Sequence, residues 1–231
     1  MMRIKDLSKR FGQKEIFCRL NLHFESGKVF ALIGPNGAGK TTLMRMILGW
    51  DKDYEGEIVC DDDIRLGYSP ETPWFPEILT GQEVLSYYLE VRGTDKKTAI
   101  TESARLMQEV GLDLEKDTLV KNYSKGMRQR LGVAQALIGD PDLLLLDEPS
   151  AGLDFFGQLQ MQTLIGKLKA QGKTIILNSH LLHDVEKVAD AGYLFMNTHV
   201  FRHFDKAEFE HESLADMFIA TAKGARDEGL Y

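Results

Sequence analysis

A run of consecutive residues in this chain has the residue types and spacing of a loop that binds phosphate. Its glycines allow the backbone to bend until several N–H groups point at one anion. Lys40 follows the last glycine and can reach the β- and γ-phosphates of a nucleoside triphosphate, and the hydroxyl of Thr41 can be a ligand of Mg²⁺. The complete motif is Gly34, Pro35, Asn36, Gly37, Ala38, Gly39, Lys40, Thr41 and Thr42.

The segments on either side of this loop have the structure that the motif requires. The apolar run 29–33 before it is predicted to be a strand, and residues 43–48 after it are predicted to be helical. The positive end of the helix dipole would add to the attraction for phosphate. A glycine-rich turn that binds nothing is the alternative, but every position of the motif is filled. We therefore predict that the protein binds a nucleoside triphosphate.

Three further polar residues are expected at the same edge of the sheet. Asp147 and Glu148 come directly after the apolar strand 143–146, and His180 follows the predicted strand 173–178. In open parallel sheets, ligands bind at the carboxyl ends of the strands. Asp147 is then placed to hold Mg²⁺, Glu148 to polarise the attacking water, and His180 to sense the γ-phosphate. The alternatives are a helix cap without catalytic role for the acidic pair, and an ordinary loop position for the histidine.

The order of elements indicates an α/β fold, with a phosphate-loop NTPase core and a mainly parallel sheet. The run 143–146 is continuously apolar, which is typical of a strand buried on both faces. We expect an antiparallel β part at the N-terminus, a helical subdomain inserted at about 72–140, and a single domain over 1–231. The remaining expected elements are strands at 4–7, 20–24 and 66–69, and helices at 80–92, 95–110, 124–137, 155–171, 182–188 and about 213–223.

Two short segments allow opposing interpretations. Phe11 lies between Arg10 and Gly12, so it is either a platform for the adenine base or an ordinary packed side chain. Residues 51–57 and 61–63 are acidic and rich in turn formers, but they lack the alternating spacing and distal Glu of a calcium loop. A solvated hairpin is the better interpretation of these acidic residues.

Composition narrows the classes of partner. The formal charge of -7 and the acidic pI are unfavourable for binding nucleic acid, so no nucleic-acid partner is expected. No apolar run approaches the roughly 18 residues that span a bilayer, and no signal-peptide core is present. Cys18 and Cys60 show neither metal spacing nor a disulfide framework, which favours a cytoplasmic location. Work at a membrane would therefore need a partner chain.

From about residue 3 to about residue 200, the chain resembles the ATP-binding subunit of an ABC transporter. Its Walker A loop is 34–42, and its Walker B strand is 143–148. Residues 123–130 stand where the family carries its Leu-Ser-Gly-Gly-Gln signature. The D-loop is 150–154, the histidine switch is 178–180, and Phe11 falls at the aromatic position that stacks adenine.

The resemblance implies a mechanism that one chain cannot complete. In the family, two such domains close head to tail over two ATP molecules, as a homodimer or a heterodimer. Ser124 and Gly126 of one protomer would touch the γ-phosphate held by the other, and Asp154 of the D-loop would belong to the same nucleotide site. The pair would power a separate integral membrane permease, with the chain peripheral on the inner face of the cell membrane.

Two motifs depart from the family pattern. Lys125 and Met127 replace a Gly and a Gln of the signature. Glu71 replaces the Gln of the Q-loop, a ligand of Mg²⁺ or water, and 67–71 resembles a variant common in an exporter-like branch. A carboxylate also ligates Mg²⁺, so Glu71 stays a candidate metal ligand together with Thr41 and Asp147.

Other functions remain open at this point. A soluble ATPase of the same superfamily, such as an iron–sulfur assembly ATPase, would share these motifs. A nucleotide-gated interaction module would bind ATP without hydrolysing it. Trp74 and Phe75 lie where the family docks the coupling helix of its permease, although both aromatics could instead cover the local core.

Overall fold

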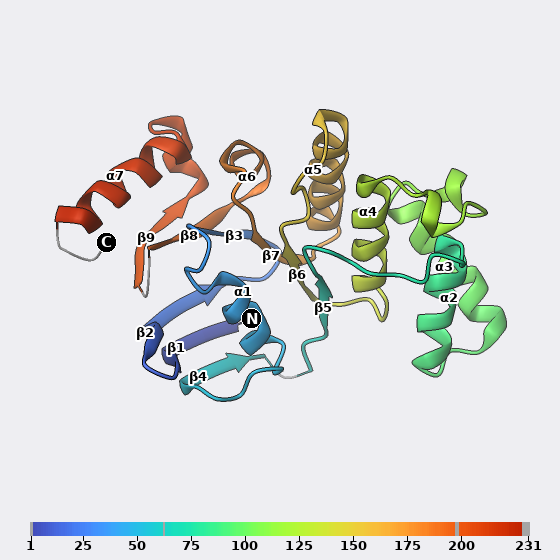
Figure 1. The fold of residues 1–231 in the computed structure, drawn as a ribbon, viewed down its shortest axis with the longest axis horizontal. Helices are drawn as coiled ribbons and strands as arrows, with labels where there is room; N and C mark the ends of the chain where they lie inside the picture. Colours follow the sequence, from blue (N-terminus) through green and yellow to red (C-terminus); the bar gives the residue numbers. More distant parts are fainter. Residues whose placement is uncertain (1, 62, 197–198, 228–231) are drawn as a thin grey trace.

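The computed structural model describes residues 2–61, 63–196 and 199–227, which form two sheets surrounded by helices (Figure 1). In these residues the larger sheet has the strand order β5-β6-β7-β3-β8-β9. Neighbours from β5 to β8 run parallel, and β9 pairs antiparallel with β8. The α/β class with a mainly parallel sheet is thus confirmed. The strands are β3 Val29–Ile33, β5 Leu66–Ser69, β6 Leu143–Asp147, β7 Thr174–Asn178, β8 Ala191–Met196 and β9 His199–Asp205.

The central strands of this sheet are buried on both faces. Every residue of β3, β6 and β7 is buried, as the continuous apolar run 143–146 predicts. Successive residues of β3 belong to different core clusters, because side chains along a strand alternate between its faces. Val29 packs with the helical side of the molecule, whereas Phe30 packs with α1 (Lys40–Ile47) and the smaller sheet. The edge where the strands end is therefore held by packing on both sides.

The smaller sheet is antiparallel and places β1 (Met2–Phe11) between β2 (Lys14–Phe24) and β4 (Glu55–Cys60). This confirms the antiparallel N-terminal part. It also shows that the solvated hairpin predicted for the acidic segment is wrong, since the segment contributes a strand that pairs with β1. Ile58 and Cys60 of β4 pack against the core, which explains why so acidic a segment joins a sheet. Asp62 lies outside the described residues.

The helices between β5 and β6 lie at the opposite end of the molecule from the C-terminal helix (Figure 1). A side chain caps the start of each: Thr80 and Glu83 form a capping box, Asp95 accepts two backbone N–H groups, and Ser124 accepts from Met127 N. These helices are α2 Gly81–Val91, α3 Lys96–Glu109 and α4 Lys125–Ala136, with 3₁₀ turns at Asp113–Glu115 and Val120–Asn122.

The last third of the chain holds more strand than its pattern indicates. No strand after residue 178 is predicted from the sequence, but β8 and β9 complete the sheet there. The C-terminal helix expected over about 213–223 runs from Leu214 to Asp227. Among the described residues, we find no helix with both the length and the apolarity to cross a bilayer. The remaining elements are α5 Phe155–Ala170, α6 Leu182–Val188, a 3₁₀ turn at Lys206–Glu210 and α7 Leu214–Asp227.

Candidate active site

The loop between β3 and α1 has the geometry of an anion site. Gly39 stands at the N-cap of α1 with φ 92°, and Gly37 has φ 85°, a region that favours glycine. No side chain caps the first turn of α1, so its N–H groups remain available to an anion. Gly34 is required for another reason. A side chain there would collide with the carbonyl oxygen of Phe195 in β8.

Lys40 lies folded into this loop. Its side chain is buried, and its Nζ donates to the carbonyl oxygens of Gly34 at 2.7 Å and Pro35 at 3.0 Å. Burial lowers the pKa of Lys40, and the nearby carboxylates of Glu148 and Asp147 act in the opposite direction. The ammonium is thus a desolvated cation held by neutral oxygens, which a phosphate oxygen would replace favourably.

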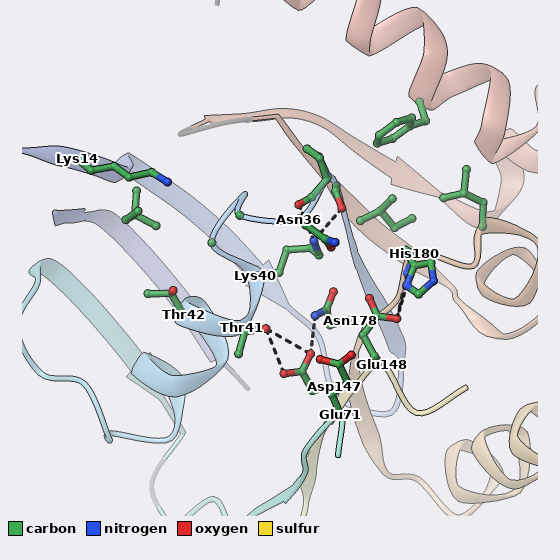
Figure 2. A pocket seen from close by; sticks show the side chains of 18 residues that line it. Lys14, Asn36, Lys40, Thr41, Thr42, Glu71, Asp147, Glu148, Asn178 and His180 are labelled. Atoms are coloured by element: carbon green, nitrogen blue, oxygen red, sulfur yellow. Dashed lines mark hydrogen bonds and ion pairs between the residues drawn. The ribbon is translucent and has the colours of Figure 1, made fainter. Parts of the chain in front are cut away.

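Asp147 at the end of β6 is the centre of a polar cluster. Its carboxylate accepts from Asn178 Nδ2 at 2.5 Å and from Thr41 Oγ1 at 3.2 Å (Figure 2). It also accepts from the Tyr68 hydroxyl at 3.5 Å. Burial, together with the charge of Asp147, raises the pKa of Tyr68 to about 12, so the phenol remains a donor. The Oδ1 atom of Asn178 is buried without a hydrogen-bond partner. The cluster therefore orients a carboxylate and a hydroxyl toward the same space.

Glu148 and His180 form a second pair beside this cluster. His180 Nδ1 lies 2.7 Å from Glu148 Oε2, and Glu148 is only 8% exposed (Figure 2). Burial raises the pKa of Glu148, and the contact with His180 partly offsets that effect. The backbone of Glu148 has φ 49°, an unusual conformation for a residue with a side chain. Such an oriented, partly desolvated carboxylate is suited to general-base chemistry.

Except for Tyr68, these groups line one pocket of about 840 Å³, a size that suits a small-molecule ligand. The loop between β3 and α1 lines one part of the pocket, and Asp147, Glu148 and His180 lie together on one side of it (Figure 2). Glu71 also lines it, with an exposed side chain, while its backbone oxygen accepts from Gln129 Nε2 at 2.6 Å. The pocket therefore brings together the loop and every predicted residue of the metal and catalytic sets.

Five predicted binding residues lie outside this pocket lining. One is Ala38 of the loop, which is buried in the core. Phe11 is 52% exposed, with Lys9 Nζ 4.7 Å from its ring centroid. Ser124 caps α4 at an exposed position, and Gly126 lies in the first turn of that helix. Asp154 caps α5 by accepting from Gly157 N at 2.7 Å. Their assignment to nucleotide binding stays a prediction.

Trp74 and Phe75, near β5, are predicted either to dock the permease or to cover the local core, and the two residues differ in burial. Phe75 is 3% exposed and belongs to the core, whereas Trp74 is 79% exposed. Trp74 lines a second pocket of about 580 Å³ together with Trp50, Tyr68 and Arg45. Only the tryptophan of the pair is thus available to a partner.

Several pocket residues have no individual role in the site predicted from the sequence, including Asn178, which is named there only as part of the histidine switch. Asn178 ends β7, opposite Asp147 in the register of neighbouring parallel strands, and a polar residue at a buried strand end was the available signal. Lys14, Ile16 and Phe218 also line the pocket but carried no signal, because they reach it from β2 and α7.

The donor set can be tested for a metal site. Within the described ranges no three His, Cys, Asp or Glu residues are grouped as they would be around a bound ion. Thr41 and Asp147 instead present a hydroxyl and a carboxylate. Mg²⁺ binds such oxygen ligands, usually one or two carboxylates completed by water and substrate phosphates. The residues present therefore fit Mg²⁺ delivered with a nucleotide.

Comparison with known proteins agrees with this geometry. Lantibiotic transport ATP-binding protein SrtF of Streptococcus pyogenes is 36% identical over 203 residues, 84% of this chain and 87% of SrtF. Bacitracin transport ATP-binding protein BcrA of Enterococcus faecalis is 37% identical over 197 residues, 80% of this chain but 63% of BcrA. A solved ATP binding subunit of an ABC transporter superposes with a TM-score of 0.82 at 26% identity, covering 96% of this chain and 99% of that one. The sequence profile of the ABC transporter family matches residues 17–151, so this chain belongs to that family and is one of its ATP-binding ATPases.

Proposed function

We propose that this chain is the ATP-hydrolysing subunit of an exporter, and that it works as a dimer on a separate membrane permease at the cytoplasmic face of the membrane. The observation that carries the proposal is the convergence of Lys40, Asp147 and Glu148 on one pocket. The relatives named for lantibiotic and bacitracin transport support the transport role. The resemblance of residues 67–71 to an exporter-like branch favours export.

Phosphate binding uses groups that are already in place. Lys40 would exchange the carbonyl oxygens of Gly34 and Pro35 for β- and γ-phosphate oxygens. The free N–H groups of α1 would hold the remaining phosphate charge. The hydrogen bonds of Lys40 and of the α1 N–H groups are stronger to a charged phosphate oxygen than to a neutral acceptor.

Thr41 and Asp147 would hold Mg²⁺, and Glu71 at the pocket wall is a further candidate ligand. When bound, Mg²⁺ would neutralise negative charge that develops on the phosphate oxygens. Asn178 and Tyr68 fix the Asp147 carboxylate by hydrogen bonds, so that its free lone pairs face the pocket.

Glu148 would act as the general base. An attacking water would form a bond to the γ-phosphorus, the bond to the leaving ADP oxygen would break, and the water proton would pass to the Glu148 carboxylate. His180 holds that carboxylate through the 2.7 Å contact. His180 is the more exposed member of the pair, with 57% of its side chain accessible, so it would also meet the γ-phosphate.

The exposed start of α4 supports a composite site. Ser124 and Lys125 are exposed, and a side chain at Gly152 would collide with the Lys125 ammonium, so the signature adjoins the D-loop. A positive helix N-terminus beside an added lysine favours an anion. We assign that anion to the γ-phosphate held by a second protomer, either an identical chain or a related one. Closure of the pair would convert ATP binding into motion.

Trp74 and the pocket beside it are the proposed docking surface for the permease. Large exposed aromatics next to a hollow are typical of partner sites. Trp74 is close to Glu71 in the sequence. A displacement of the docked permease would therefore be transmitted to the nucleotide site through the segment that joins these two residues.

The test is the Glu148→Gln variant, with Glu57→Gln as a matched control at an exposed position of β4. Loss of a general base should lower kcat by about 10²–10⁴. The variant should also form a dimer in Mg-ATP, measured by light scattering on a sizing column, whereas the control should behave as wild type. An unchanged rate would remove Glu148 as the base, and a monomer under these conditions would refute the composite site.

A second experiment separates the transporter from a soluble ATPase. The full chain, expressed with its neighbouring genes, should co-purify with an integral membrane protein after detergent extraction. A chain that hydrolyses ATP but is recovered without any membrane protein would leave the ATPase intact and refute the permease partnership.

A further inference from the structure

Lys14 is an exposed lysine that lines the nucleotide pocket without a role in the site described so far. It is the first residue of β2 and is paired in register with Phe11 across the β1–β2 turn. Figure 2 shows its side chain extending from β2 toward the loop, at the opposite end of the pocket from Glu148 and His180. In the described part of the chain, no carboxylate or carbonyl pairs with its ammonium.

The neighbouring charges leave this ammonium available. Arg10 of β1 forms an ion pair with Glu15 of β2, its Nη2 lying 2.7 Å from Glu15 Oε2. Lys9 is buried and satisfied by Asp51 at 2.9 Å and by Asp53. Lys14 is thus an unpaired positive charge at the rim of a pocket for an anion.

The catalytic residues at the end of the pocket opposite Lys14 indicate which way the triphosphate chain runs. Lys40 reaches the β- and γ-phosphates, and Glu148 marks the side where the γ-phosphate is attacked. The α-phosphate and ribose must therefore lie toward the other side, where Thr42 and Ile16 line the pocket. A side chain at Gly39 would collide with Ile16, which shows how closely β2 lies against the loop.

We propose that Lys14 is a nucleotide-binding residue that contacts an α-phosphate oxygen, an assignment that rests on the proposed ATP site. The ammonium supplies charge to a phosphate that the loop alone would meet with neutral N–H groups. The contact is made at the rim and is shared by ATP and ADP, because both carry the α-phosphate. It therefore stabilises bound nucleotide without acting on the bond that breaks.

The experiment measures dissociation constants of Mg-ATP and Mg-ADP by calorimetry for wild type, Lys14→Gln and Lys14→Arg. Lys14→Gln should raise the dissociation constants of both nucleotides by the same factor, about three- to tenfold. The factor is small because a charge-assisted contact at an exposed site contributes little to binding. Lys14→Arg should restore most of the affinity. At saturating ATP, kcat should be unchanged while KM rises. The effect should shrink with added salt.

The control variant is Lys5→Gln. Lys5 is an exposed residue of β1 outside the nucleotide pocket, so this variant should bind both nucleotides as tightly as wild type. Equal affinities for wild type and Lys14→Gln would overturn the proposal, and so would loss of ATP binding with ADP binding unchanged. Wild-type protein that binds neither nucleotide would instead refute the proposed function itself. Thermal unfolding of Lys14→Gln should match wild type, which excludes a folding defect as the cause of weaker binding.

Discussion

Gly34→Ala tests whether the first glycine of the loop is required by space. Its backbone does not have a positive φ, so the added methyl would cause no intrinsic strain. That methyl would lie well inside contact of the Phe195 carbonyl oxygen, and only 3.0 Å from Phe195 Cβ. Ordinary carbon–carbon contacts are about 3.5–4.0 Å, so the loop or β8 has to move by about 0.5–1 Å.

The size of the effect follows from what this displacement disturbs. Overpacking a closely packed contact costs about 1–3 kcal/mol of unfolding free energy. The Gly34 carbonyl also holds Lys40 at 2.7 Å, so the lysine would move with the loop. A misplacement near 1 Å can cost about 10² in rate. We expect urea unfolding to show the loss of stability, and steady-state assays to show kcat lowered by up to about 10².

Gly166→Ala is the matched control. Gly166 lies within α5, and among the described residues no atom comes within 4 Å of the position that its methyl would take. The same substitution there should stabilise the protein by about 0.5–1 kcal/mol, because alanine is the better helix former. A Gly34→Ala protein with wild-type stability and kcat would show that contact with β8 does not dictate glycine at this position.

Three other variants test stability and the proposed permease contact. The Arg65 guanidinium, bound to Asp142 at 3.0 Å, holds the pKa of that carboxyl at about 2, below its unfolded value of about 3.9, so the pair stabilises the fold above that value. Arg65→Gln should therefore lower the urea unfolding midpoint slightly relative to wild type at pH 7, because an exposed ion pair contributes little. The difference should disappear as pH falls toward 2, and a difference that grew in acid would contradict the assignment. Phe75→Ala should destabilise the protein by about 3–5 kcal/mol. Trp74→Ala should leave unfolding within about 0.5 kcal/mol of wild type but reduce co-purification with the permease; normal recovery of the complex would show that Trp74 is not at the interface.

Much of the core could be predicted because its signals are local. The strand, loop and helix around Lys40 lie within a few residues of one another, and the caps at Thr80 and Ser124 accept from backbone N–H groups three positions away. The carboxyl end of a parallel strand also has one location, so Asp147 could be assigned to the site from its position after an apolar run.

What could not be predicted depends on pairing between distant segments. β4 is too acidic to indicate a strand alone, and its place beside β1 arises from Ile58 and Cys60 packing on the core. The amide of Asn178 meets Asp147 only because β6 and β7 are neighbours in the sheet. The positive φ of Glu148 likewise gives no sequence signal, since glutamate rarely adopts it.

The C-terminal helix gives the nucleotide pocket a wall that none of the motifs contains. Leu214 and Met217 of α7 are fully buried, and the Leu214 backbone donates to Glu186 Oε1 at 2.6 Å. This docking brings Phe218 to the pocket beside Leu182. A protein shortened before residue 213 would keep every signature of an ATPase and yet open that flank to water. The presence of the ATPase motifs therefore does not by itself ensure that the nucleotide pocket is fully enclosed.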